Sequence, residues 1–188
     1  MPLLHLVAGP NGSGKSTYVE RILQPVTLLP FVNADLIAAE RWPEAQVKHA
    51  YEASRAAAEE RLQLLADGQS FITETVFSHP SKLGLIREAH LRGYLVHLHV
   101  LLLPVDAAVN RVAERVQHGG HDVPEQKIRE RHARLWDLIA DARSVADRAE
   151  FFDNSSAKRP FRRVAEYERG RIVGEPGWPV WAPATLTD

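Results

Sequence analysis

Short apolar segments alternate along the chain with longer amphipathic segments. The apolar segments have the length of buried β-strands and fall at residues 3–8, 28–32, 70–73, 94–103 and 150–153. Strands of a parallel sheet are apolar on both faces, and the helices that connect them cover the sheet. The alternation therefore predicts an α/β fold with a five-stranded, mainly parallel sheet between two layers of helices.

The amphipathic segments predict five helices, which glycine and proline residues separate. They fall at about residues 15–24, 44–66, 81–92, 105–117 and 124–147. In the second helix the expected buried stripe consists of Val47, Ala50, Tyr51, Ser54, Ala58, Leu62 and Leu65. In the fifth helix it consists of Ile128, Leu135, Leu138, Ile139, Ala142 and Ala146.

The C-terminal part of the chain has a different pattern. Residues 161–173 predict a terminal strand, or a hairpin that turns at Arg169 and Gly170. Residues 175–188 contain three prolines together with Trp178 and Trp181, and we expect this tail to be irregular.

The composition fits one globular domain over residues 1–188. A hydrophobic content of 45% can fill the core of one domain of this length, and hardly of two. The net charge of -1 gives no general attraction to nucleic acid or to anionic membranes, so small-molecule chemistry fits better. The absence of cysteine excludes disulfides, thiol catalysis and thiolate metal sites. No apolar run is long enough to span a bilayer, and we expect a soluble, cytoplasmic protein.

A glycine-rich loop with the pattern GxxxxGK[ST] follows the first predicted strand and reads G-P-N-G-S-G-K-S-T over residues 9–17. Its glycines permit backbone turns that other residues resist, so consecutive N–H groups converge on phosphate oxygens at a helix N-terminus. Lys15 would reach the β- and γ-phosphates of a nucleotide, and the Ser16 hydroxyl would bind Mg²⁺. The alternative is an ordinary glycine-rich turn, which does not explain the lysine and hydroxyl in register.

We therefore expect ATP and Mg²⁺ as cofactors and a P-loop NTPase-type, three-layer α/β/α fold. The expected nucleotide-binding residues are Gly9, Asn11, Gly12, Ser13, Gly14, Lys15, Ser16 and Thr17. The strand at 94–103 ends without the acidic residue that usually helps to hold Mg²⁺ in such proteins. Magnesium would then depend on Ser16, on water and on a carboxylate from Asp35 or Glu74.

Two carboxylates follow predicted strands. Asp35 lies in N-A-D-L-I at residues 33–37, and Glu74 stands between Thr73 and Thr75. Because the carboxyl ends of parallel strands share one edge, both could reach the phosphate loop. Asp35 could accept the proton of an acceptor hydroxyl, and Glu74 with its two threonines suits a polyol or sugar. The alternatives are a helix N-cap for Asp35 and a surface capping cluster for residues 73–75.

Arginines gather around a glycine-jointed corner between the fourth and fifth predicted helices. They are Arg111, Arg115, Arg129, Arg131 and Arg134. The segment 111–134 resembles a small helical lid over a transferring phosphoryl group, whose oxygens match guanidinium forks. For Arg129 we favour a solvated pair with a neighbouring glutamate. Arg131 falls inside the buried stripe of its helix, where an arginine is costly without an anion, so we expect it to face the nucleotide.

The histidines carry a weaker signal. His5, His97 and His99 alternate along apolar strands and are expected to be packed or hydrogen-bonded core residues rather than ligands. His118 and His121 flank two glycines, but no carboxylates stand at ligand spacing, so a metal site there is disfavoured.

Four elements together make the chain resemble the zeta-toxin family of P-loop kinases. They are the phosphate loop, N-A-D-L-I at 33–37, E-T at 74–75, and R-V-Q-H-G-G-H-D-V-P at 115–124 ahead of I-R-E-R at 128–131. The resemblance implies ATP-dependent phosphorylation of a hydroxyl on a small metabolite, with UDP-N-acetylglucosamine the substrate of the better-known toxins. It also implies an antitoxin protein as a partner.

Carried onto matching positions, the resemblance implies catalytic roles for Lys15, for Asp35 as the base, and for Arg115 and Arg131, which would stabilise transition-state charge. Glu74 and Thr75 would contact the acceptor, and Asn33 belongs to the same substrate element. Two other functions fit the same loop. One is an ATPase or nucleotide switch that acts through a protein partner, and the other is a polynucleotide-type kinase, which the near-neutral charge disfavours.

Overall fold

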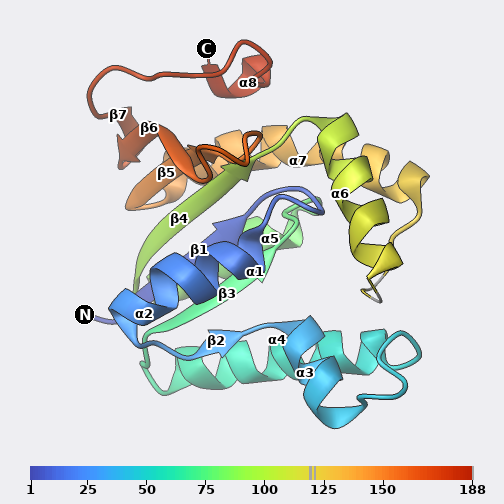
Figure 1. Ribbon diagram of the computed structural model, residues 1–188. Helices are drawn as coiled ribbons and strands as arrows, with labels where there is room; N and C mark the ends of the chain where they lie inside the picture. The colour runs from blue at the N-terminus through green and yellow to red at the C-terminus, as the bar shows by residue number, and fades with distance from the viewer. Residues whose placement is uncertain (119, 121, 188) are drawn as a thin grey trace.

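The computed structural model describes residues 1–118, 120 and 122–187, and its centre is one β-sheet (Figure 1). Within these residues the strands are β1 (Leu3–Ala8), β2 (Phe31–Val32), β3 (Phe71–Thr75), β4 (Leu95–Leu102), β5 (Arg148–Asp153), β6 (Arg162–Glu168) and β7 (Arg171–Ile172). Their order is β2-β3-β1-β4-β5-β6-β7. The first five are parallel, and β6 and β7 extend the sheet as an antiparallel hairpin. The predicted parallel sheet and C-terminal hairpin are confirmed.

Helices connect the parallel strands. They are α1 (Lys15–Tyr18), the π-helical turn η1 (Val19–Leu23), α2 (Gln24–Thr27), α3 (Ala34–Arg41), α4 (Ala50–Ala66), α5 (Ser81–Leu91), α6 (Val105–Gln117), α7 (Glu125–Val145) and α8 (Ala184–Thr187). In the part of the chain that the structure describes, none of these helices has the length and apolar character that crossing a membrane requires.

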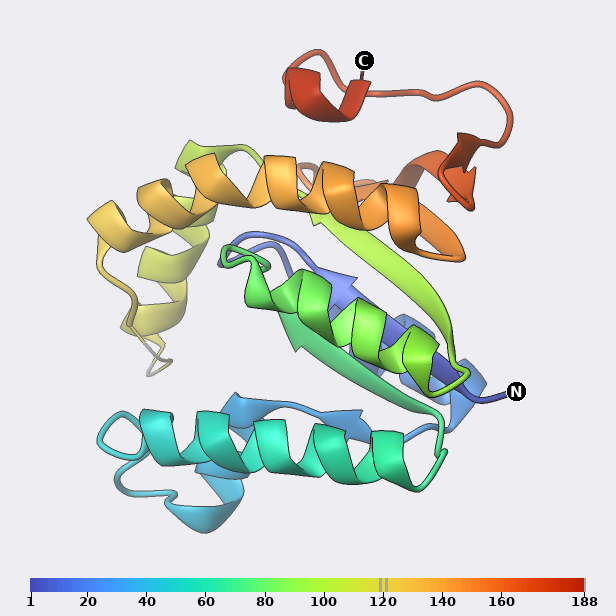
Figure 2. The ribbon, with the colours of Figure 1, turned by 180° about the vertical axis from the view of Figure 1, so that it is seen from behind.

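The side chains of β1 point alternately to the two faces of the sheet, and each face has its own core. Leu4, Leu6 and Ala8 pack in the larger cluster with residues of α4, α5 and α7. Val7 packs on the other side with Tyr18 of α1. Figure 2 shows α4, α5 and α7 in front of the sheet, and Figure 1 shows α1 and α2 on the opposite face. The three-layer α/β/α fold is therefore confirmed.

The second predicted helix differs from the structure in its start and in its buried face. It begins at residue 50 rather than 44, and turns precede it. Tyr51 and Leu62 of the expected stripe are exposed, whereas Leu65 is buried as expected, together with Ala53 and Ala57, which lay outside the stripe. The helix packs closely against α3 and the sheet, and alanine side chains allow this approach. Tyr51 and Leu62 therefore face solvent, and except at Leu65 the predicted stripe lay beside the face that is buried.

The first predicted helix does not end before Pro25. Its path continues through η1 into α2, where Pro25 stands in the first turn. Proline is tolerated there because the first N–H groups of a helix have no intrahelical acceptor. The wider π-helical turn ahead of it lets the chain continue without a break.

The C-terminal tail is more ordered than expected. Residues 173–183 lack regular structure, but they lead into α8, and Trp178 and Trp181 pack on the larger core cluster. Leu186 is fully buried. Its carbonyl accepts a hydrogen bond of 2.7 Å from Nη1 of Arg143 on α7, and that guanidinium also lies 4.6 Å from the ring centroid of Tyr167. Tertiary contacts therefore order a segment whose local sequence favours irregular structure.

Replacing Leu186 with alanine tests whether the tail contributes to stability. Leu186→Ala removes a fully buried side chain, and we expect the free energy of unfolding to fall by about 2–4 kcal/mol in urea titrations. Val180→Ala is the matched control, because Val180 in the same tail is fully exposed and its loss should cost less than about 0.5 kcal/mol. Equal stability of the two variants would contradict a docked tail.

Candidate active site

The phosphate loop starts where β1 ends, and its backbone conformation requires glycine. Gly9 has φ 152° and Gly14 has φ 88°, values that side-chain-bearing residues rarely adopt. A Cβ on Gly9 would lie 2.6 Å from the carbonyl oxygen of Leu101, and one on Gly14 would lie 2.8 Å from Nδ2 of Asn154. The loop then leads into α1 at Lys15. Its N–H groups thus surround a helix N-terminus, which is a site for anions.

Two side chains from distant elements hold this loop in place. Asn154, directly after β5, donates from Nδ2 to the carbonyl of Ser13 at 2.8 Å. Arg111 on α6 donates from Nη2 to the Asn154 carbonyl at 2.8 Å and from Nη1 to the Gly12 carbonyl at 3.5 Å. Arg111 therefore braces the loop rather than serving only as an arginine of a lid. The role of Asn154 has no local sequence signal, because a single polar residue after a strand is common.

Lys15 and Ser16 lie in the first turn of α1, and each contacts a group beside the loop. The Lys15 ammonium donates to the carbonyls of Gly9 at 3.1 Å and Pro10 at 3.0 Å. The Ser16 hydroxyl lies 3.1 and 3.2 Å from the two carboxylate oxygens of Glu74, to which it donates. β3 extends to Thr75, so Glu74 lies within the strand beside β1, level with Val7. Glu74 thus supplies the acidic group that the tip of β4 lacks.

The charges of these residues influence one another. Burial lowers the pKa of Lys15, while the carboxylates of Glu74 and Asp35 act to raise it and Arg115 and Arg131 act to lower it. Burial raises the pKa of Glu74, against the opposing effects of Lys15 and the Ser16 hydrogen bond. The residues predicted from separate motifs therefore form one electrostatic site.

Asp35 and Asn33 have different roles at the start of α3. The Asn33 side chain is the N-cap, since its Oδ1 accepts hydrogen bonds from the N–H of Asp35 at 2.7 Å and of Leu36 at 3.2 Å. The capping role considered for Asp35 thus belongs to Asn33. The Asp35 side chain is exposed and lines the cleft next to the phosphate loop.

The threonines beside Glu74 have local hydrogen bonds. Thr75 accepts through Oγ1 from the N–H of Phe77 at 3.1 Å, and Thr73 donates to the carbonyl of Val32 at 3.0 Å. Thr75 also lines the cleft. The alternative of a surface capping cluster is wrong for Glu74, which contacts Ser16.

The five arginines around the corner between α6 and α7 divide into two groups. Arg111, Arg115 and Arg131 line the cleft with the phosphate loop. Arg129 instead pairs with Glu125 at 2.8 Å and Asp106 at 2.9 Å, which confirms the solvated interpretation, and Arg134 is exposed. Gly119 of the predicted glycine joint lies outside the described residues, and so does His121.

The cleft between the loop, α3, α4 and α6 has a volume of about 630 Å³. This is within the range of small-molecule sites, about 300–1,000 Å³. All of the predicted nucleotide-binding residues except Gly9 and Ser13 line it. Ser13 is instead fully buried beneath the loop.

The residues present fit a nucleoside triphosphate with a magnesium ion. The loop forms a cradle that a Cβ would fill, and the Asn11 Oδ1 is a buried atom with no hydrogen-bond partner among the described residues. The two carbonyls that hold the Lys15 ammonium would be exchanged for phosphate oxygens. Ser16 and Glu74 together offer the oxygen ligands that Mg²⁺ prefers.

Residues 4–138 match the model of a family described as an AAA domain, AAA_33. The match covers well over half of the chain and spans the phosphate loop, Asp35, Glu74 and Arg131. The chain belongs to this family. No curated protein matches the chain significantly.

Several solved structures share the fold of this AAA domain. A chain of the AvrRxo1-ORF1:-ORF2 complex with ATP superimposes with a TM-score of 0.72 at 16% identity, over 97% of this chain and 66% of that one. A chain of the PezAT chromosomal toxin-antitoxin system of Streptococcus pneumoniae gives 0.63 at 14%, over 81% and 67%. A gluconokinase from Sinorhizobium meliloti 1021 gives 0.53 at 18%, over 81% and 82%. The chain spans 60–66% of the AvrRxo1 chains it matches. At these low identities the superpositions show a shared fold alone.

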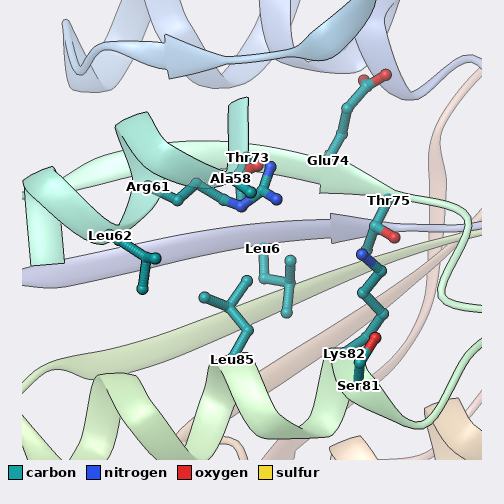
Figure 3. A pocket seen from close by; sticks show the side chains of 10 residues that line it. All are labelled: Leu6, Ala58, Arg61, Leu62, Thr73, Glu74, Thr75, Ser81, Lys82 and Leu85. Atoms are coloured by element: carbon teal, nitrogen blue, oxygen red, sulfur yellow. The ribbon is translucent and has the colours of Figure 1, made fainter. Parts of the chain in front are cut away.

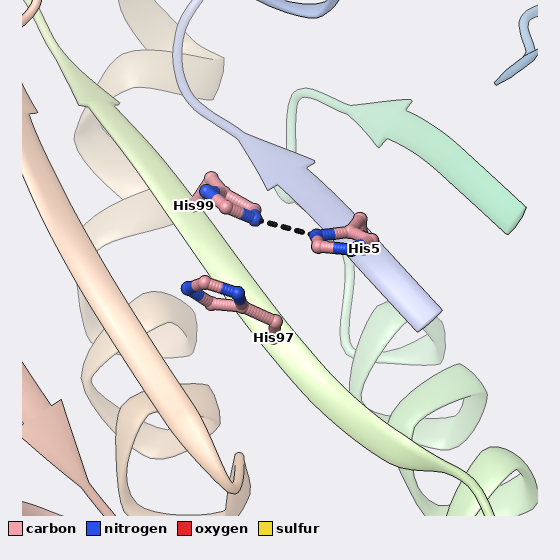
Figure 4. Close-up of side chains that lie close together, drawn as sticks. All are labelled: His5, His97 and His99. Atoms are coloured by element: carbon pink, nitrogen blue, oxygen red, sulfur yellow. Dashed lines mark hydrogen bonds between the residues drawn. The ribbon is translucent and has the colours of Figure 1, made fainter. Parts of the chain in front are cut away.

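Three histidines lie close together on the adjacent strands β1 and β4 (Figure 4). His5 Nδ1 and His99 Nε2 share a hydrogen bond of 2.9 Å, His99 Nδ1 shares one of 3.1 Å with the Tyr18 hydroxyl, and His97 bonds to Glu150 at 2.9 Å. Their ligand atoms lie within 4.8 Å of one another, as in a metal site. The hydrogen bonds are those expected of the core residues that the sequence predicted, and through Tyr18 they support α1.

This cluster makes the stability of the fold sensitive to acid. Burial lowers the pKa of His5 from 6.5 to about 4, with His97 adding to the effect, and lowers the pKa of His99 well below its usual value. The unfolded chain then binds more protons than the folded one below pH 6.5. Stability is therefore complete above that pH and is lost as the pH falls toward 4.

We expect His5 alone to account for about 3 kcal/mol of this loss. Urea unfolding measured between pH 7 and pH 4 checks this, because that range spans the unfolded pKa of His5, 6.5, and its folded pKa, about 4. His5→Gln should flatten the pH dependence, and His79→Gln is the control, because His79 is exposed. A profile that His5→Gln leaves unchanged would show that the histidines are not the origin of the acid sensitivity.

Proposed function

We propose that the protein is a kinase that transfers the γ-phosphoryl group of ATP to a hydroxyl of a small metabolite. The observation that carries the proposal is the position of Asp35. Its carboxylate lines the phosphate-loop cleft, yet Asn33 performs the capping that would otherwise explain an acid at this position. A carboxylate at this position can accept the proton of a hydroxyl that enters the cleft. The family membership and the kinases among the structures with this fold support the same conclusion.

In the proposed reaction, Asp35 accepts the proton of the acceptor hydroxyl as the hydroxyl oxygen forms a bond to the γ-phosphorus. The bond between that phosphorus and the β,γ-bridging oxygen breaks, and ADP leaves. Lys15 and the loop N–H groups stabilise the charge on the β- and γ-phosphates. Mg²⁺, when bound, neutralises part of the same charge, and Ser16 and Glu74 would hold it.

Arg115 and Arg131 complete the site from α6 and α7. Both arginines line the cleft, and both act to lower the pKa of Lys15. Guanidinium groups bind phosphate oxygens in pairs of hydrogen bonds, so the two arginines would stabilise the transferring group. The segment 111–134 would then act as a lid whose closure brings these side chains to the phosphates.

The acceptor proposed from the zeta-toxin resemblance is a nucleotide sugar such as UDP-N-acetylglucosamine. The motifs at residues 33–37, 74–75 and 115–124 support it, and so does the shared fold with a chain of the PezAT toxin-antitoxin system. An antitoxin protein would then be the partner. Asn33 would shape the acceptor site indirectly, by fixing the start of α3, because its side-chain oxygen is already used to cap that helix.

Replacing Asp35 tests the proposed base. Asp35→Asn keeps the size of the side chain but cannot accept the proton, and we expect kcat to fall by about a hundredfold or more while ATP affinity changes little. Mass spectrometry of a metabolite extract incubated with ATP and Mg²⁺ gives the acceptor and the rate. Glu40→Gln, an exposed acid on the same helix, is the control and should be fully active.

The same incubation separates the proposed kinase from its rivals. Release of inorganic phosphate without any new phosphorylated metabolite would favour an ATPase or switch. Phosphorylation of nucleic-acid ends alone, with strong salt dependence, would favour a polynucleotide-type kinase. Unchanged turnover of Asp35→Asn on a phosphorylated metabolite would remove Asp35 from the mechanism.

Replacing Glu74 tests the proposed magnesium site. Glu74→Gln removes the charge next to Ser16, so we expect the Mg²⁺ concentration for half-maximal activity to rise by about tenfold or more. Glu20→Gln is the matched control, because Glu20 is an exposed acid whose charge also reaches Glu74. If both variants shift the magnesium requirement equally, Glu74 acts only through its distant charge.

A further inference from the structure

A second, smaller pocket adjoins the phosphate-loop cleft (Figure 3). It has a volume of about 200 Å³ and lies between α4 and α5, against β1 and β3. Arg61, Glu74, Thr75 and Lys82 line both the pocket and the cleft, so the two are continuous. A volume of this size holds part of a metabolite rather than a whole nucleotide.

Two basic side chains enter the pocket from opposite walls. Figure 3 shows Arg61 extending from α4 and Lys82 from α5, both toward the edge of β3. Within the described residues, neither side chain has a hydrogen bond or an ion pair with the protein, whereas Arg129 on the surface has two acidic partners. Both are partly buried. Two like charges thus share one pocket.

This arrangement costs free energy in the ligand-free protein. Burial lowers the pKa of Arg61, against the smaller opposing effect of Glu60, and burial together with the charge of Arg61 lowers the pKa of Lys82. The carboxylate that lines the pocket does not compensate, because Glu74 points away from both cations (Figure 3) and accepts a hydrogen bond from the Ser16 hydroxyl. An anion between the two cations would remove the penalty.

The other groups in the pocket offer little to such an anion. The hydroxyls of Thr73, Thr75 and Ser81 already hydrogen-bond to Val32, Phe77 and His79 respectively. The remaining wall is apolar and comes from Leu6, Ala58, Leu62 and Leu85. The pocket thus combines an apolar wall with two cationic hydrogen-bond donors. It suits a ligand that has an apolar part next to an anionic group.

We propose that Arg61 and Lys82 bind an anionic group of the phosphoryl acceptor, a carboxylate or a phosphate, while the acceptor's hydroxyl lies at Asp35. This inference rests on the proposed kinase function and narrows its substrate class to anionic alcohols. A neutral alcohol would leave both cations unpaired, and a site built for a polar partner strongly rejects an analogue that lacks it. Arg61 and Lys82 are therefore specificity residues, distinct from the groups that bind the nucleotide phosphates.

A metabolite extract separated by anion exchange tests the substrate class. Each fraction is incubated with the protein, ATP and Mg²⁺, and we expect phosphorylated products from the anionic fraction only. For the acceptor found, Arg61→Gln and Lys82→Gln should each raise KM by roughly tenfold or more and change kcat little, because they bind the ground state and the transition state alike. Arg55→Gln on α4 and Arg87→Gln on α5 are the matched controls, since both arginines are exposed outside the pocket.

The stability of the variants shows whether the two residues have a merely structural role. Removing one of two unpaired like charges should leave the melting temperature unchanged or raise it. A loss of stability in both variants would indicate that the cations support the fold, which would overturn the proposal. A neutral acceptor, or a KM that neither variant changes, would overturn it as well.

A binding measurement without turnover separates failure of this inference from failure of the kinase proposal. The protein is saturated with Mg²⁺ and a non-hydrolysable ATP analogue, and its melting temperature is followed as inorganic phosphate or acetate is added. Either anion should stabilise the wild type more than the Arg61→Gln/Lys82→Gln double variant, and the more effective one identifies the group as phosphate or carboxylate.

Two combinations of the turnover and binding results separate the two proposals. If the anion stabilises the wild type through these two residues but no fraction yields a product, the kinase proposal fails and the anion pocket stands. If a neutral alcohol is phosphorylated and neither anion distinguishes the wild type from the double variant, the pocket inference fails and the kinase stands.

Discussion

The conformation of the phosphate loop is the constraint on which the rest of the structure depends. Its glycines adopt positive φ values, so the loop is a run of turns and has no regular hydrogen-bond ladder of its own to hold it in place. Other elements must hold it: Asn154 after β5 and Arg111 on α6 both bond to its carbonyls, and β4 contacts it closely at Leu101. The strand order that places β1 between β3 and β4 is what makes these contacts possible.

The sequence predicts those parts of the molecule whose signals are local. The phosphate loop, the parallel strands and the buried stripe of α7 follow from patterns within a few residues or turns. Asn154 could not be identified in this way, because its role depends on a contact with Ser13, 141 residues away. The prediction of the buried face of α4 was wrong for a related reason. Which face of this helix is buried depends on the neighbouring helix α3, which packs closely against its alanines, and not on the sequence of α4 alone.

Asp35 shows how the structure chooses between interpretations that the sequence leaves open. An aspartate near a helix start is compatible with capping and with catalysis, and both were plausible from N-A-D-L-I alone. The side chain of Asn33 excludes the capping role for Asp35, because it accepts the hydrogen bonds from the N–H groups of Asp35 and Leu36. Catalysis by Asp35 is then the interpretation that we propose. Similarly, Arg61 and Lys82 belong to no sequence motif, and only the structure shows that they share a pocket in which neither has a hydrogen bond or an ion pair with another described residue.

The distribution of charge links these observations. The whole chain has a net charge of -1, yet the cleft is lined by six basic and two acidic side chains. Proteins accept such local repulsion where a ligand removes it, and the buried histidine cluster shows the opposite case, in which neutral groups satisfy one another. Mg²⁺ neutralises part of a bound triphosphate, so the nucleotide matches only part of the positive excess. An acceptor with its own negative charge would match the remainder, and the position of Arg61 and Lys82 away from the loop says where that charge would lie.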